Sequence, residues 1–311
     1  MSDIPKIKAK YKAEYRAVKF FGALFCLLPY TVSLAMAAGL AKIASWIMHK
    51  RVKEAVRRIK LVKGDVITDK QAKRIAWISL RNTAFNLVEM LRIKKTNLAF
   101  IHKIMPNVAE SIQKIKGIMD ASGNSKGVIL ALPHMGNWDL TGSAVYLTGL
   151  PIFSVAGKQH NPLMNKLMNE MRSGHGMEIL ERRTNTAAQI RTRLKNGEIF
   201  AILPDTRCFT PDIMTPFLGG EANLARGMAV FARAAEVPII PTIIHRVGWK
   251  RFEIKLFDPI YPNMEMDKQE DIVRLTHEVI AILDKEIQAN PEQWFWYNKR
   301  WVLDPIEPAS K

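Results

Sequence analysis

The chain has 311 residues, of which 48% are hydrophobic, and it carries a formal net charge of +17 at pH 7. This apolar content excludes a disordered chain and suffices for one large core or two modest ones. With only Cys26 and Cys208, the sequence also excludes a disulfide-stapled secreted domain and a cysteine-based metal site, and it indicates a reducing compartment.

The positive charge is concentrated in the first 100 residues, which hold 21 Lys and Arg against 6 Asp and Glu. A basic segment of this kind suits either a nucleic acid or the anionic surface of a membrane. The run from Phe20 to Ala41 contains no charged residue, and its length of 22 positions compares with the roughly 20 that a helix needs to cross a bilayer core. Because Lys and Arg flank both ends of this run, we expect a membrane surface as partner and no nucleic acid.

The form of this membrane attachment stays open. Pro29 interrupts the run and Ser33 lowers its hydrophobicity, so a helix that spans the bilayer and a helix that lies in the interface are both consistent with it. A cleaved signal peptide is an alternative because residues 35–37, Ala-Met-Ala, have the form of a cleavage site. The basic stretch 50–63 after the run argues against export, and a buried helix of a soluble protein is the remaining alternative.

Apolar residues at helical spacing predict that the first part of the chain is all helical. We expect a basic membrane anchor over residues 1–50 and a further helical region over residues 51–122. The individual helices are predicted at residues 13–49, 51–62, 69–93 and 107–121. Thr68 is placed to act as the N-cap of the third helix.

The pattern then changes to short apolar runs that alternate with helix-length segments. Strands are expected at residues 127–132, 152–156, 177–180, 198–203, 237–244 and 251–257, and helices at residues 161–173, 184–196, 222–236 and 267–289. The last strand alternates with period two, which is typical of a strand with one solvated face. Residues 123–311 are therefore expected to form an α/β domain with a central mixed sheet flanked by helices.

His134 follows the first of these strands directly, in the stretch ALPHMGNWDL of residues 131–140. Because ligands of α/β sheets collect beyond the carboxyl ends of the strands, this is a typical position for a site residue. Gly136 and Asn137 can form a turn, and Asp139 would lie on the first turn of the next helix and fold back towards the imidazole. A carboxylate there would fix the ring tautomer and stabilise the imidazolium that forms when the other nitrogen takes a proton.

An ordinary structural role is the alternative for this pair. Asp139 would then favour the helix N-terminus through the macrodipole, and His134 would bond a loop carbonyl. A metal site is weakly supported because the local spacing provides no third ligand.

The stretch HMGNWD resembles the H-x4-D/E motif of the lysophospholipid and glycerolipid acyltransferase superfamily. The surrounding chain resembles the lipid A biosynthesis branch, the late acyltransferases that add secondary acyl chains. Further blocks are similar to that family in the same order, namely KQHNPLMNKLMNEMR, GMEILERR, KNGEIFAILPDTR, TPFLGGEANLARGMAVFARAAEVPIIP and PEQWFWYNKRW. The resemblance covers roughly residues 20 to 305. It implies an enzyme without a cofactor that moves a fatty acyl chain from an acyl carrier protein or coenzyme A thioester to a hydroxyl of a phosphorylated glycolipid.

The resemblance also implies roles for individual residues. His134 would be the general base and Asp139 its partner. Arg172 matches a motif arginine that would hold a phosphate or the developing charge, since a guanidinium fork suits both. Asp205 matches an acid that follows a strand and would orient Arg172 or a backbone loop. Where the family often has Asp-Gln-Asp, this chain has Asp-Thr-Arg at residues 205–207.

Four further residues are candidates for substrate binding. Arg182 and Arg183 could bind substrate phosphates, or they could form a solvated charged pair. Phe217 and Gly219 fit a loop that closes over the acyl chain, or they could be ordinary core and turn residues. The aromatic and basic residues of the tail 294–301 suit either a membrane interface or a packed core.

We therefore expect a membrane-attached enzyme on the cytoplasmic side of the cell inner membrane, with a lipid A precursor as acceptor. HMGNWD also resembles the mannoside-lipid acyltransferases of the same superfamily, so a mannoside lipid or a lysophospholipid stays open as acceptor. A non-catalytic protein that binds anionic lipids through its basic first third is the alternative from another class. A serine hydrolase is not expected because the sequence has no G-x-S-x-G elbow.

Overall fold

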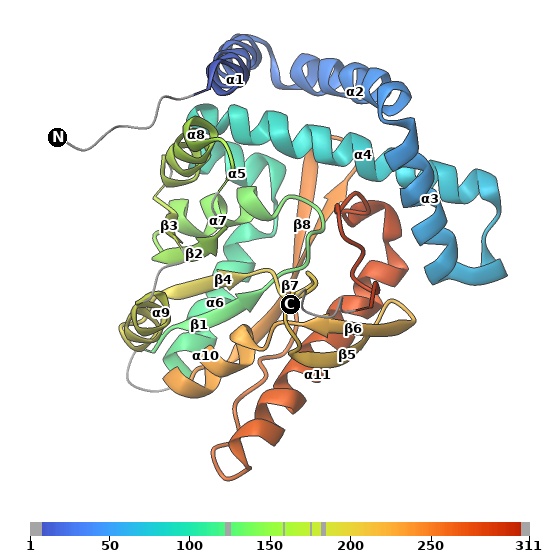
Figure 1. The fold of residues 1–311 in the computed structure, drawn as a ribbon. Coiled ribbons are helices and arrows are strands. Elements are labelled where there is room, and N and C mark those ends of the chain that lie inside the picture. The colour runs from blue at the N-terminus through green and yellow to red at the C-terminus, as the bar shows by residue number, and fades with distance from the viewer. Residues whose placement is uncertain (1–7, 122–125, 158, 175, 182–184, 306–311) are drawn as a thin grey trace.

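The computed structural model of the chain describes residues 8–121, 126–157, 159–174, 176–181 and 185–305. Within them a six-stranded sheet forms the centre of the molecule, and helices cover both of its faces (Figure 1). In spatial order its strands are β3 (Glu178–Glu181), β2 (Ile152–Ala156), β4 (Ile199–Ile202), β1 (Val128–Ala131), β7 (Ile239–Val247) and β8 (Arg251–Leu256). Neighbours pair in parallel except β8, which is antiparallel to β7. The predicted α/β fold with a mixed sheet is confirmed.

The central strand β1 contributes side chains to a core on each face of the sheet. Ile129 and Ala131 face a core that includes α9 (Thr186–Lys195), α10 (Gly227–Ala235) and α11 (Lys268–Ala289). Val128 and Leu130 face a second core with α5 (Leu98–Ile104), α6 (Val108–Ala121) and α7 (Trp138–Leu147). All four residues of β1 are buried, which explains why this strand is a continuous apolar run instead of an alternating one.

Strand register decides which loops meet at the carboxyl edge of the sheet. β1 and β4 are neighbours and parallel, and their last paired residues are Ala131 and Ile202. His134 and Asp205 each follow this pair by three positions. Two residues far apart in the sequence are thereby brought to the same edge.

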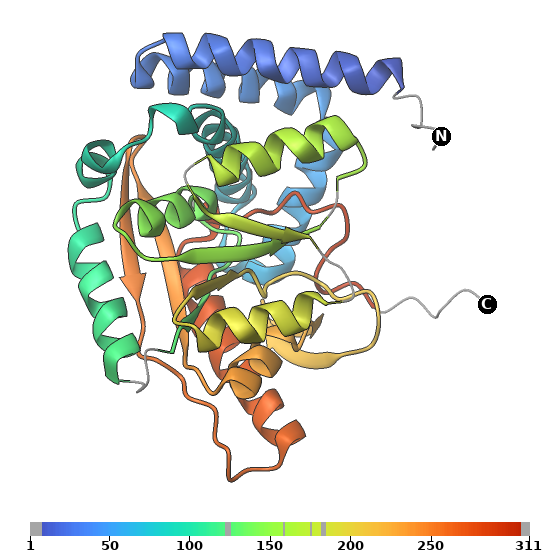
Figure 2. The same cartoon turned by 90° about the vertical axis from the view of Figure 1, so that its left-hand side faces the viewer.

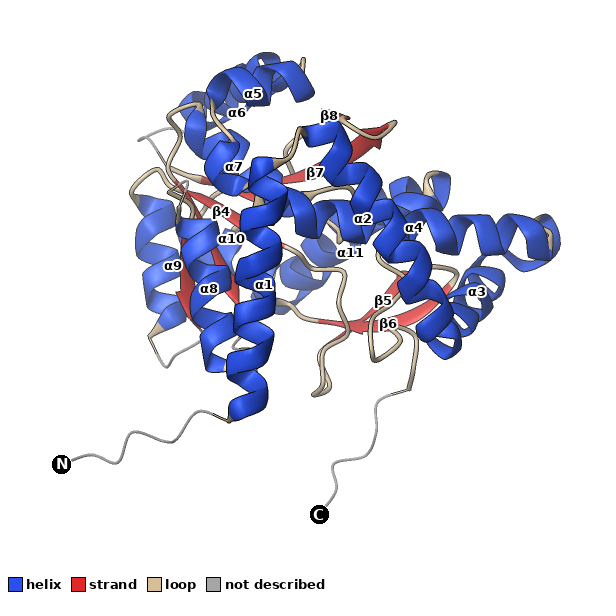
Figure 3. Ribbon diagram, turned by 90° about the horizontal axis from the view of Figure 1, so that it is seen from above, coloured by secondary structure: helices blue, strands red, loops and turns tan. Residues whose placement is uncertain are grey.

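The N-terminal helices form a layer on one side of the sheet domain, best seen in Figure 2. This layer consists of α1 (Ala9–Leu27) and α2 (Tyr30–Ile47), which pack on α4 (Asp69–Leu91) and α8 (Pro162–Ser173). Seen from above, α1 runs beside α8 (Figure 3). The chain continues through α3 (His49–Lys63) and the short 3-10 turns η1 (Gly64–Val66) and η2 (Ile93–Lys95).

The prediction of one helix over residues 13–49 is wrong, because the chain breaks at Leu28 and Pro29. Leu28 is extended, with ψ 151°, as the steric demand of a following proline favours. The proline nitrogen also has no hydrogen to continue the ladder of α1. The break turns one long apolar run into two shorter helices.

Helix α4 connects the N-terminal layer to the end of the chain. It begins at the predicted cap, where Thr68 accepts a hydrogen bond from the Gln71 amide and the Gln71 side chain returns to the Thr68 amide. Ser79 Oγ donates to Trp294 O at 2.5 Å, and Tyr297 OH donates to Ala76 O at 2.7 Å. The C-terminal segment after η3 (Pro291–Gln293) is therefore bound along α4.

The predicted helix over residues 222–236 begins only at Gly227. Residues 220–224 instead form β6 (Gly220–Leu224), which pairs with β5 (Ile213–Phe217) as an antiparallel hairpin. The hairpin packs against α11, so tertiary contacts decide the conformation of a segment whose composition also suits a helix.

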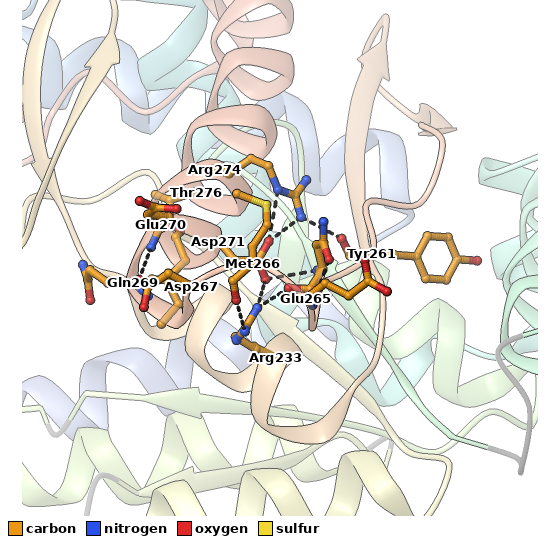
Figure 4. A network of polar contacts seen from close by, with 12 residues as sticks. Arg233, Tyr261, Glu265, Met266, Asp267, Gln269, Glu270, Asp271, Arg274 and Thr276 are labelled. Carbon is orange, nitrogen blue, oxygen red and sulfur yellow. Dashed lines mark hydrogen bonds and ion pairs between the residues drawn. The ribbon is translucent and has the colours of Figure 1, made fainter.

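A buried carboxylate holds the connection between β8 and α11 (Figure 4). Asp271 accepts hydrogen bonds from Arg233 Nη1 and Arg274 Nη2, each at 2.6 Å, and from the Asn263 amide at 3.1 Å. Burial opposes ionisation of Asp271, but the hydrogen bonds from both arginines outweigh it and hold its pKa below the ordinary value. The stabilisation is therefore present at neutral pH and is lost as the pH falls through that lowered pKa.

Asp271→Asn should lower the free energy of unfolding by about 3 kcal/mol, because two arginines lose their charged partner at a buried position. Chemical denaturation of the two proteins measures the difference. Glu278→Gln is the matched control, since Glu278 contacts Arg274 at the exposed end and should cost no more than about 0.5 kcal/mol. Equal losses of unfolding free energy in Asp271→Asn and Glu278→Gln would contradict the role of Asp271 as the buried partner of both arginines.

Candidate active site

A cavity of about 670 Å³ opens at the carboxyl edge of β1, β2 and β4. Its volume lies in the range of small-molecule sites. The apolar part of its wall includes Leu132, Val155, Ile179, Ile190, Phe200 and Phe231, and the polar part includes His134, Asp139, Gln159, Arg172 and Thr206. A ligand that combines an apolar part with a polar reactive group therefore matches this lining.

His134 is held by Asp205 at the rim of this cavity. His134 Nδ1 lies 2.7 Å from Asp205 Oδ1, and the His134 amide donates to Asp205 Oδ2 at 2.7 Å. The indole of Trp294 donates to the same oxygen at 2.8 Å. Since the carboxylate accepts at Nδ1, that nitrogen carries the hydrogen and Nε2 is the one left for a substrate.

Each partner shifts the pKa of the other. Burial alone would lower the pKa of the His134 imidazole, but the charge and hydrogen bond of Asp205, with a smaller contribution from Asp139, raise it above its ordinary value. Burial alone would raise the pKa of Asp205, but His134 and the hydrogen bonds from Trp294 and the His134 amide hold it below the ordinary range. Asp205 is therefore a carboxylate at neutral pH, placed to stabilise a protonated imidazole.

Asp139 pairs with Arg172 and not with His134. Arg172 Nε donates to Asp139 Oδ1 at 2.9 Å, across the gap between the first turn of α7 and the last turn of α8. The predicted contact of Asp139 with the imidazole is wrong. Of the two roles predicted for Asp205, orienting Arg172 or a backbone loop, the structure shows the second, because Asp205 accepts from the His134 amide in the loop after β1. His134 pairs with Asp205 instead of Asp139 because β1 and β4 are parallel neighbours, so that the residues after their carboxyl ends meet.

The turn between His134 and Asp139 has the form that the sequence predicted. Gly136 has φ +60°, and a Cβ there would lie 1.9 Å from Ile244 O, so only glycine fits. Asn137 caps α7 by accepting from the Leu140 amide at 3.0 Å. Asp139 thereby lies in the first helical turn, as expected.

Among the described residues, Phe217 and Gly219 are not part of the cavity lining. Phe217 is buried at the end of β5, where its ring meets Trp294 with centroids 6.2 Å apart, and Gly219 lies in the exposed β5–β6 turn. This packing agrees with the alternative of ordinary core and turn residues, and the place of Phe217 and Gly219 over an acyl chain stays a prediction. Arg182 and Arg183 lie outside the described residues.

The aromatic residues of the tail form a core instead of a membrane-facing cluster. Trp294, Trp296, Tyr297 and Trp301 are all buried, and the rings of Trp294 and Trp296 meet edge to face at 4.8 Å. Trp294 was missed as a site residue because nothing near it in the sequence indicates that its indole reaches an acid after β4. The packed-core alternative is the one that the structure supports.

Asp205→Asn should lower the pKa of His134, because the amide removes the charge that raises it while burial, which lowers it, stays. We expect the pKa to fall from above the ordinary value of a histidine to below it. NMR titration of the histidine ring signals measures it without any substrate. Asp139→Asn is the matched control and should produce a smaller decrease; an unchanged titration of His134 in Asp205→Asn would contradict the pairing.

Comparison with known proteins shows which sequences the chain resembles. The chain is 22% identical over 209 residues to a phosphatidylinositol mannoside acyltransferase of Mycobacterium tuberculosis, an alignment that covers 64% of each protein. It is 25% identical over 187 residues to a lipid A biosynthesis acyltransferase of Haemophilus influenzae, covering 58% of this chain and 56% of that relative. These alignments span less than two thirds of the relatives. Residues 5–302 match the bacterial lipid A biosynthesis acyltransferases as a family, and the chain belongs to that family.

Proposed function

We propose that the protein transfers a fatty acyl chain from an acyl thioester to a hydroxyl of a phosphorylated glycolipid, with His134 as general base. The observation that carries the proposal is the contact between His134, the first residue of the stretch HMGNWD, and Asp205, beside a cavity with a largely apolar lining. Family membership supports an acyltransferase. The reaction class follows because a base beside an apolar cavity suits a hydroxyl nucleophile and a fatty acyl donor.

The proton steps can be written from the His134 geometry. Nε2 takes the proton of the acceptor hydroxyl while its oxygen attacks the thioester carbonyl carbon, and a tetrahedral oxyanion forms. When this intermediate collapses, the C–S bond breaks and the imidazolium returns its proton to the departing thiolate. Asp205 stabilises the imidazolium between these steps and keeps Nε2 directed at the cavity.

Arg172 is assigned to charge recognition. Among the described residues its hydrogen-bond partner is Asp139, which engages only Nε. The terminal guanidinium nitrogens then remain for a phosphate of the acceptor or for the oxyanion. Asp139 serves as the positioning residue of Arg172, a role that differs from the general-base partner expected from the sequence.

The cavity supports an acyl chain as occupant. Four large apolar side chains contribute to its lining, namely Ile179, Ile190, Phe200 and Phe231. Each methylene buried against such side chains contributes about 0.8 kcal/mol. The acyl carrier protein and coenzyme A thioesters share this chain and the reacting carbonyl, so both are donors of the proposed reaction.

The acceptor that we propose is a lipid A precursor. One relative, that of Haemophilus influenzae, is named as a lipid A biosynthesis acyltransferase. A phosphatidylinositol mannoside is the second candidate, because two further relatives, from Mycobacterium tuberculosis and Mycolicibacterium smegmatis, carry that name. Both acceptors combine a sugar hydroxyl with a nearby phosphate, which is the chemistry proposed for His134 and Arg172.

We further propose that the α1–α2 layer lies flat in the membrane interface. By length and mean hydropathy, α2 is able to cross a bilayer. Its buried side, however, packs on α4 through Leu34, Ala37 and Ala41. Large apolar side chains of the layer are exposed, namely Leu27, Met36, Leu40, Ile43, Trp46 and Ile47. An in-plane arrangement buries this exposed face in lipid without separating α2 from α4.

The proposed location is the cytoplasmic side of the cell inner membrane. Both cysteines are free, as suits a reducing compartment. The basic residues of the first 100 positions would contact anionic lipid headgroups, each contributing about 1 kcal/mol near the surface.

His134→Ala should lower kcat by about 10²–10⁴-fold with acyl thioester and lipid A precursor, because the acceptor hydroxyl loses its base. Binding of the acyl donor should be retained. Mass spectrometry of the lipid product together with steady-state kinetics measures both quantities. His277→Ala, on the outer side of α11, is the control and should keep wild-type kcat; wild-type turnover in His134→Ala would remove His134 from the reaction.

Ile43→Asp combined with Trp46→Asp should release the protein from vesicles that contain anionic lipid. Two charges on the exposed face of α2 would have to enter the interface, while the packing on α4 stays intact. Flotation of protein with vesicles measures the bound fraction. Tyr261→Asp with Met264→Asp, exposed in the β8–α11 connection at the opposite end of the molecule (Figure 1), is the matched control. Equal binding of both double variants would contradict the flat orientation.

A further inference from the structure

A buried ion pair lies behind the turn of residues 134–139, outside the cavity lining. Arg246 of β7 donates to Glu89 of α4 through Nη1 at 2.8 Å and Nη2 at 2.6 Å. The two side chains are 1% and 3% exposed. Taking two charges out of water is costly, and apolar side chains of similar volume often stabilise a fold as well. Packing alone therefore does not explain why this buried position holds an arginine and a glutamate instead of two apolar residues.

Each member of the pair also reaches the turn through an amide. Glu89 Oε2 accepts from Asn137 Nδ2 at 2.6 Å. Arg246 Nη2 donates to Asn86 Oδ1 at 2.7 Å, and Asn86 Nδ2 donates to Gly136 O at 2.5 Å. Two consecutive residues of the turn are thus bound by one network. An apolar pair would fill the space but would bind neither residue.

The turn is held from its other side by the C-terminal segment. Gly136 N donates to Gln293 O at 3.2 Å, and Phe295 N donates to His134 O at 3.0 Å. The Gln293 side chain in turn accepts from the Arg246 amide at 3.1 Å. The backbone between His134 and Asp139 is therefore fixed between α4, β7 and the end of the chain.

The Glu89 carboxylate also accepts a hydrogen bond from the N-terminal layer. Tyr30 OH, at the start of α2, donates to Glu89 Oε1 at 2.5 Å. Burial, followed by the charge of Glu89, raises the pKa of this phenol, so the hydroxyl stays protonated as a donor. With two bonds from Arg246, one from Asn137 and one from Tyr30, the carboxylate is fully satisfied.

We propose that Glu89 and Arg246 are positioning residues of the active site, which hold the turn through Asn137 and Asn86 and thereby set the separation of His134 and Asp139. The inference rests on the proposed acyl transfer. His134 carries the base and Asp139 holds Arg172, so this separation also places the guanidinium relative to the base. A small displacement of such groups lowers turnover without removing any reacting atom.

The test replaces the pair by apolar side chains, Glu89→Met with Arg246→Met. We expect a folded protein with a lower melting temperature, because Tyr30, Asn137 and Asn86 lose hydrogen-bond partners, together with kcat lower by about 10-fold to 100-fold and an unchanged KM for the acyl thioester. The matched control is Asp271→Leu with Arg233→Met, which removes another buried pair with no bond to the turn (Figure 4). That control should keep wild-type kcat. Wild-type kcat in Glu89→Met/Arg246→Met would overturn the inference.

A second variant decides the question if the double variant does not fold. Asn137→Ser keeps an oxygen that caps α7 but removes the amide that donates to Glu89. It should lose kcat by a similar factor, and wild-type kcat in this variant would overturn the inference.

A measurement that needs no substrate, amide hydrogen exchange, tests this inference independently of the proposed function. If the wild-type protein transfers no acyl chain to any tested acceptor, the proposed function fails. Amide hydrogen exchange of residues 134–141 then decides the positioning role on its own. Exchange in this segment should be faster in Glu89→Met/Arg246→Met than in the wild type and the Asp271 control; equal exchange in all three proteins would overturn the inference.

Discussion

The buried carboxylate of Asp205 is the interaction on which the site depends. It is almost fully inaccessible and accepts three hydrogen bonds, from the His134 ring, the His134 amide and the Trp294 indole. A carboxylate at such a position is tolerated only when its oxygens are satisfied and a positive charge can form beside it. The loop after β1, the end of β4 and the C-terminal tail are therefore tied to one another at the point where the imidazole meets the cavity.

The two acids of the site are suited to different tasks by their surroundings. Asp205 is buried and contacts His134, where it fixes the hydrogen on Nδ1 and raises the pKa of the imidazole. Asp139 lies at the cavity wall on a helix N-terminus and contacts a guanidinium. The first pair is placed to move a proton and the second to attract an anion. The buried network of Glu89 and Arg246 contributes a fixed separation between them.

Local signals in the sequence predicted the six strands of the central sheet, the cap at Thr68, the turn with Gly136 and the position of His134 at a strand end. Those features depend on residues that are neighbours in the chain. The partner of His134 was assigned wrongly, because Asp205 reaches it through the parallel pairing of β1 and β4, and strand order is not a local property. The indole of Trp294 was missed for the same reason. Residues 222–224 were assigned to a helix because their hairpin partner and the contact with α11 are tertiary.

The identity of the acid that acts with His134 is tested most directly by a double-mutant cycle on kcat. The cycle compares His134→Ala with Asp205→Asn and, separately, His134→Ala with Asp139→Asn. We expect Asp205→Asn to add almost nothing to His134→Ala, because the two residues act as one unit, whereas Asp139→Asn should multiply the loss through its effect on Arg172. The reverse pattern, with Asp139 silent in the His134→Ala background and Asp205 additive, would contradict the assignment of Asp205 as the partner of the base.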